Sequence, residues 1–106
     1  MQNSSNQIAG ASEVDALVGQ AWSQHYHGQN DNAAQAFRDI VQNNPDHIDA
    51  NYGLGLTLKT LGRKDEAKQS FLKTKQLIEA AATAQKDENA RFQMLSRMVE
   101  QQLASL

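Results

Sequence analysis

Three histidines, His25, His27 and His47, are the residues of this chain whose chemistry could hold a metal ion. His25 and His27 are two positions apart, and residues at that spacing on a helix point to different sides. The chain has no cysteine, which excludes disulfides, thiol catalysis and metal sites built on cysteine. We therefore predict surface histidines, no metal site and no cofactor.

Two other patterns could bind phosphate. Gly53 and Gly55 resemble the start of a nucleotide-binding loop, but no strand precedes them and no third glycine follows. Lys64, Lys68 and Lys75 share one helix face, and an ordinary solvated face carries the same pattern. No nucleophile has a general base at hand, and no pair of acids lies in an apolar setting. We predict that the chain is not an enzyme.

Charge is distributed unevenly along the chain. Residues 1–58 carry six acids and one base, a net charge of −5, whereas residues 59–106 carry nine bases and six acids, a net charge of +3. The total of −2 does not favour nucleic acid. Solvated faces are the simpler explanation of the asymmetry, and head-to-tail association of the acidic and basic ends is the alternative.

The chain lacks the patterns that place a protein in or across a membrane. No apolar run reaches the length of a transmembrane helix. Residues 1–11 are polar and lack the basic start and apolar stretch of a secretion signal, so we predict a flexible polar tail there. We expect no membrane partner and a cytoplasmic location.

The elements that must position any site are helices. The 106 residues fit one small domain, Pro45 is the only proline, and no turn-punctuated alternation marks a strand. We predict an all-α fold with about five helices, three of them over residues 12–27, 32–43 and 47–61. Ser12 and Asp46 are the expected N-caps of the first and third helices.

The chain after Gly62 contains neither glycine nor proline. A single helix of that length would be unusual in a small domain. We therefore expect a break between Ala82 and Asp87, with Asp87 as the cap of a fifth helix. One long protruding helix is the alternative.

An internal repeat is the strongest pattern in the chain. A glycine, an alanine and a phenylalanine occur twice with identical internal spacing, and the two sets are separated by the period of a helix–turn–helix repeat, about 34 residues. The first set is Gly28, Ala33 and Phe37, and the second is Gly62, Ala67 and Phe71.

On these residues the chain resembles the tetratricopeptide repeat family. The second repeat adds Leu54-Gly55 and Glu66-Ala67 to the shared pattern, and the first repeat adds the closing Pro45. The resemblance implies an α-solenoid of antiparallel helix pairs, with repeats at residues 12–45 and 46–81 and a capping helix at residues 82–106. Gln20 and Gln24 depart from the family, which usually has Leu and an aromatic residue at those positions.

The resemblance also implies a binding groove lined by the first helix of each repeat. It would hold a peptide or helix of a partner protein against an aromatic cluster. The alternative is that these side chains pack together or lie under the last helix. The predicted partner-binding residues are Val18, Trp22, Tyr26, Tyr52, Leu56 and Lys59.

A second apolar stripe lies near the C-terminus. As a cap it would cover the end of the second repeat, and as a zipper it would pair with another copy in a homo-dimer. We favour the cap, and a self-assembling scaffold without a separate ligand is the alternative function. The candidate oligomer-interface residues are Phe92, Leu95, Val99 and Leu103.

Overall fold

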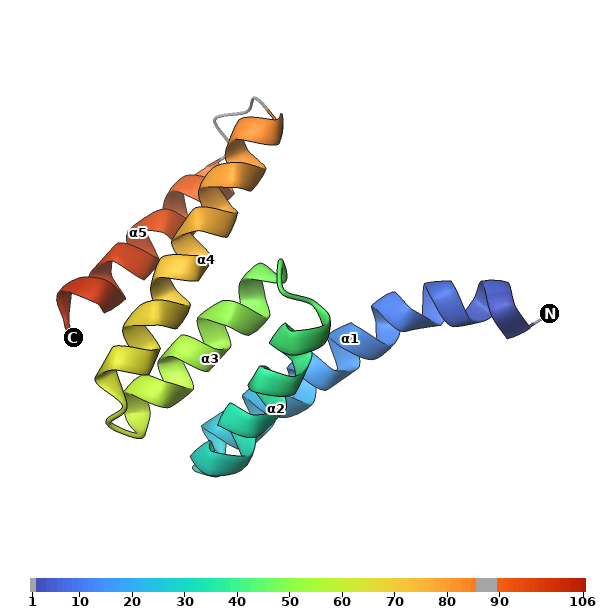
Figure 1. Cartoon of the computed structure of the whole chain (residues 1–106), viewed down its shortest axis with the longest axis horizontal. Coiled ribbons are helices and arrows are strands. Elements are labelled where there is room, and N and C mark those ends of the chain that lie inside the picture. The colour runs from blue at the N-terminus through green and yellow to red at the C-terminus, as the bar shows by residue number, and fades with distance from the viewer. Residues whose placement is uncertain (1, 86–89) are drawn as a thin grey trace.

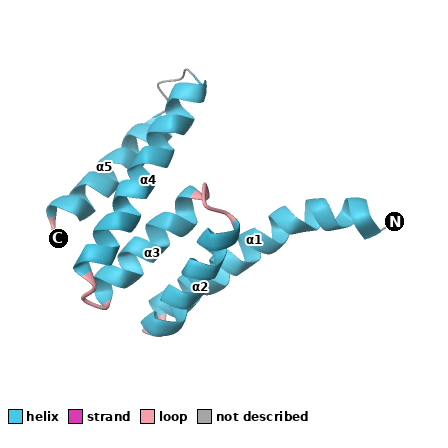
Figure 2. Cartoon of the chain, viewed as in Figure 1, coloured by secondary structure: helices cyan, strands magenta, loops and turns pink. Residues whose placement is uncertain are grey.

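The computed structural model describes residues 2–85 and 90–106, and all regular structure in these residues is helical (Figures 1 and 2). The all-α prediction and the prediction of five helices are confirmed. The helices are α1 (Gln2–Tyr26), α2 (Asn30–Asn43), α3 (Ile48–Thr60), α4 (Lys64–Gln85) and α5 (Ala90–Ala104).

The helices form a flat, consecutive array. Each helix packs against the next one in the chain, and α3 also contacts α1, so that α3 has neighbours on both sides. Figure 1 shows α1 and α5 at opposite ends of the array, and the first part of α1 extending away from the other helices. The dimensions, 49 × 38 × 19 Å, are those of a single row of helix pairs.

The turns inside the two helix pairs repeat the same geometry. Gly28 and Gly62 have φ angles of 80° and 81°, in the left-handed region where only glycine is free of strain. The amide after each glycine donates to the carbonyl five residues earlier, at 2.8 and 2.9 Å. This is the hydrogen bond that closes a helix with a C-terminal glycine. Each of these glycines therefore ends the helix that precedes it.

The two repeated phenylalanines pack against glycines of α3. Phe37 and Phe71 are both fully buried. A Cβ atom on Gly53 would lie closer than 3.0 Å to the ring of Phe37, and one on Gly55 would lie 2.6 Å from Phe71 Cε1. Both glycines of the Gly-x-Gly motif thus let a ring from a neighbouring helix approach the backbone of α3.

Two predicted helix starts are wrong. The first helix begins at Gln2 rather than Ser12. No proline interrupts residues 2–11, and extending an existing helix is far easier than nucleating one. The N-cap of α3 is His47 rather than Asp46, because His47 adopts the extended backbone of a cap and its Nδ1 accepts a hydrogen bond from the amide of Ala50 at 3.1 Å.

The chain reverses direction between α4 and α5. The alternative of one long helix is wrong, because α5 packs back along α4 (Figure 1). Lys75 and Glu100 form an ion pair across this contact at 3.6 Å. The predicted cap residue Asp87 lies outside the described residues.

Candidate partner-binding face

One surface of α1 and α3 gathers most of the predicted partner-binding residues. Asp49, Tyr52 and Lys59 lie on one face of α3, because their spacings of three and seven positions match the helical period. Trp22 joins this face from α1, and its Nε1 donates to Asp49 Oδ2 at 3.2 Å. We call the surface formed by Trp22, Tyr26, Asp49, Tyr52 and Lys59 the aromatic face.

Trp22 and Tyr26 form a stacked pair at one end of the aromatic face. Their ring centroids are 5.7 Å apart and their planes differ by 20°. The ring of Trp22 also meets buried Phe37 edge to face, at 5.3 Å and 78°. Trp22 is thus held by the core and by Asp49, whereas Tyr26, one helical turn further along, is 76% exposed. The pair is an aromatic platform open to solvent, and Trp22 is the ring that the core holds in place.

Tyr52 lies between this platform and α5. Its ring is 5.8 Å from the buried ring of Phe71. Burial raises the pKa of the Tyr52 phenol above the usual 10.0, a hydrogen bond with Gln102 opposes that rise, and the charge of Tyr26 adds to it.

Lys59 forms hydrogen bonds with residues at the C-terminal end of α5. Its Nζ donates to Gln102 Oε1 at 2.7 Å and to Ser105 Oγ at 2.6 Å. Gln102 therefore bonds both Lys59 and Tyr52. The sequence left open that the groove residues lie under the last helix instead of forming a free surface. Lys59 and Tyr52 do contact that helix, through Gln102. The open part of the aromatic face is at the α1 end.

Two further predicted contact residues are less accessible. Val18 is only 6% exposed and belongs to the buried core, so its assignment to a binding surface is corrected. Its position one turn before Trp22 puts it on the same side of α1, where the core covers it. Leu56 is half-buried and packs against the core beside Tyr52.

The apolar stripe of α5 is used within the chain. Phe92 and Val99 are 7% and 1% exposed, and Leu95 and Leu103 are partly buried against the core. This is the arrangement of a cap. An interface between copies through this stripe stays a prediction.

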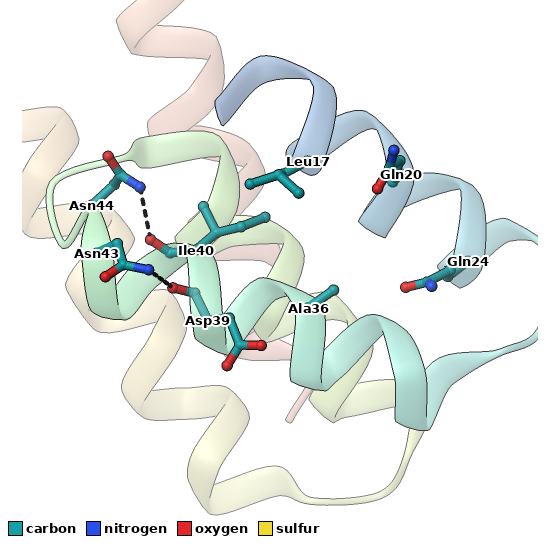
Figure 3. A pocket seen from close by; sticks show the side chains of 8 residues that line it. All are labelled: Leu17, Gln20, Gln24, Ala36, Asp39, Ile40, Asn43 and Asn44. Carbon is teal, nitrogen blue, oxygen red and sulfur yellow. Dashed lines mark hydrogen bonds between the residues drawn. The ribbon is translucent and has the colours of Figure 1, made fainter. Parts of the chain in front are cut away.

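A pocket of about 200 Å³ lies between α1 and α2, and no residue of its lining was among the predicted site residues. The side-chain Oε1 of Gln24 is buried and has no hydrogen-bond partner within the described part of the chain. The lining residues, drawn in Figure 3, are Leu17, Gln20, Gln24, Ala36, Asp39, Ile40, Asn43 and Asn44.

The histidines have structural contacts. His25 Nδ1 lies 2.8 Å from Asn30 Oδ1, and His27 Nδ1 lies 2.7 Å from the carbonyl oxygen of Ser23. Within residues 2–85 and 90–106, no three metal-ligating side chains lie together. In the same residues, no helix has both the length and the apolar character needed to cross a bilayer.

The fold and the aromatic face define a helical-repeat protein with an exposed aromatic surface. Residues 25–98 match the tetratricopeptide repeat family, and the chain belongs to that family. Repeats of this family generally mediate protein–protein interactions and are typically not catalytic. No curated protein and no solved structure significantly matches the chain.

Proposed function

We propose that this chain is a protein–protein interaction module that binds a peptide or helical segment of a partner on the aromatic face. The observation that carries the proposal is Tyr26, a large ring 76% exposed and stacked on Trp22. Tyrosine and tryptophan supply much contact area for little conformational entropy, and for that reason they dominate binding hot spots.

The fixed position of Trp22 favours binding further. The Asp49 hydrogen bond and the contact with Phe37 hold its ring before any partner arrives. A preorganised surface loses less side-chain entropy on association than a mobile one. For the same contact area, a partner should therefore bind this surface more tightly than it would bind a mobile one.

The polar rim indicates the kind of partner. Asp49 and Lys59 are already bonded within the chain, so the aromatic rings supply most of the contact energy. Residues 1–58, which include the α1 end of the face, have six acids and one base and thus a net charge of −5. We infer a partner segment with an apolar or aromatic anchor flanked by basic residues, because complementary charge speeds encounter and fixes register.

Selection from a displayed peptide library tests the proposal. Peptides selected on the wild-type chain are measured against Tyr26→Ala and Trp22→Ala, with Leu72→Ala on α4 as the control for loss of an exposed apolar side chain. Loss of a hot-spot ring should cost about 2 kcal/mol, roughly 30-fold in Kd.

Circular dichroism and denaturant melts separate loss of binding from loss of fold. Tyr26→Ala should melt as the wild type does, because its ring is largely in solvent. Peptides that bind all three variants with wild-type affinity would show that the partner surface is elsewhere.

A further inference from the structure

One face of the first helix pair is exposed to solvent, whereas the equivalent face of the second helix pair is buried. Positions related by the repeat period should have the same surroundings in a repeat array. Leu17 is 48% exposed, whereas its counterpart Asn51 is 3% exposed. The face of α1 that contains Leu17 is therefore a repeat interface without a neighbouring helix.

At two more positions of this face, α1 has polar residues where α3 has buried leucines. Leu54 and Leu58 are 8% and 2% exposed in α3, and the chain has Gln20 and Gln24 at the equivalent places in α1. Gln20 is exposed, and the Oε1 of Gln24 is buried beside the pocket without a partner within the described residues. A buried amide oxygen without a partner costs about 1–3 kcal/mol, and a donor arriving at this face would recover it.

We propose that the outer face of α5 from a second copy of this chain docks on this face, which we call the α1 edge (the pocket residues of Figure 3). The helices α1 and α5 lie at opposite ends of the array (Figure 1). Opposite Phe92 and Val99, α5 exposes Met94, which is 55% exposed, together with Arg97 and Gln101. Methionine is flexible enough to fill an irregular gap such as the pocket beside Leu17.

Charge complementarity selects α5 over a second α1 edge. The α1 edge carries Asp39, with Glu13 one turn before Leu17 on the same side of α1. The single base of residues 13–44, Arg38, is paired with Glu66 at 2.6 Å. Two α1 edges facing each other would oppose carboxylates. The outer face of α5 instead brings a guanidinium and an amide, either of which can donate to Gln24.

This contact joins two different surfaces, and each copy carries both of them. Such a head-to-tail interface leaves one free face at either end of a dimer, so assembly continues or closes as a ring. The aromatic face takes no part in it. The inference therefore goes beyond the proposed function and holds or fails independently of it.

The mass in solution, measured by light scattering over a wide range of protein and salt concentrations, tests the contact. We expect the mass to rise above 11.7 kDa with concentration and to fall back in high salt. Leu17→Gln replaces the exposed leucine of the α1 edge with a polar side chain, so it should weaken association. A wild type that keeps the monomer mass throughout, or a Leu17→Gln variant that associates like the wild type, overturns the proposal.

A charge exchange gives a second test with its own control. Asp39→Arg and Arg97→Asp should each weaken self-association roughly tenfold or more, because like charges then meet. Mixing the two variants in equal amounts should restore association, since each supplies the charge that the other lacks. If the mixture stays monomeric while the wild type associates, the contact between α5 and the α1 edge is wrong.

Discussion

The ring of Phe37 on α2 occupies the space that a side chain at Gly53 on α3 would need, since a Cβ there would lie closer than 3.0 Å to that ring. Phe71 on α4 has the same relationship with Gly55, at 2.6 Å from Cε1. One repeated phenylalanine thus packs against each side of α3, and the two glycines set how closely α2 and α4 approach it. The position of the aromatic face depends on this spacing.

A methyl group at Gly53 should therefore destabilise the fold. Overpacking a core costs about 1–3 kcal/mol, against about 1 kcal/mol gained in helix propensity, so Gly53→Ala should lower the free energy of unfolding. Gly19→Ala meets open space and should raise it by about 0.5–1 kcal/mol. Urea denaturation measures both changes. A Gly53→Ala variant as stable as Gly19→Ala would show that Phe37 moves aside easily.

Lys59 should hold the last turn of α5. Lys59→Met keeps the alkyl chain and removes the bonds to Gln102 and Ser105, so amide hydrogen exchange should accelerate at the end of α5. The cost in global stability should be about 1 kcal/mol, because Lys59 is partly exposed. Lys68→Met, on an exposed position of α4, is the control and should leave exchange in α5 unchanged. Equal exchange rates at the end of α5 in Lys59→Met and Lys68→Met would show that the Lys59 hydrogen bonds do not stabilise this turn.

Tyr52 should make stability fall in alkaline solution. Its pKa is higher in the folded than in the unfolded chain, chiefly through burial, so the folded state holds the proton more tightly. This contribution is complete below pH 10.0, the usual tyrosine pKa, and is lost as the pH rises through the folded-state pKa.

Tyr52→Phe should therefore lose less stability than the wild type between neutral pH and pH about 11. Denaturant melts across that range measure the difference. Tyr26→Phe controls for the loss of a phenol and should keep most of the wild-type dependence, because the charge of Tyr26 is the smallest of the causes acting on Tyr52. An unchanged alkaline slope in Tyr52→Phe would contradict the assignment.

The repeat architecture was predictable because its determinants are local. A glycine that ends a helix acts within one turn of chain, and the spacing of Phe37 and Phe71 reports the period directly. The role of Gly53 was not predictable, because it depends on a ring from another helix.

The site was less predictable, because it depends on how the helices pack. Helical periodicity places Val18 and Trp22 on one side of α1 but does not tell which of them the core covers. The bonds from Gln102 to Lys59 and Tyr52 depend on where α5 lies, and Lys59 and Gln102 are far apart in sequence. Gln20 and Gln24 depart from the family pattern on the α1 face that no helix covers.

Peptide titration followed by Trp22 emission tests the central claim most directly, since Trp22 is the only tryptophan of the chain. Selected peptides that lack tryptophan should change the Trp22 emission progressively until the chain is saturated with peptide. Tyr26→Ala should weaken their binding roughly 30-fold, and Leu72→Ala should leave it unchanged. Peptides that bind without altering Trp22 emission, and with equal affinity for Tyr26→Ala, would contradict a binding site on the aromatic face.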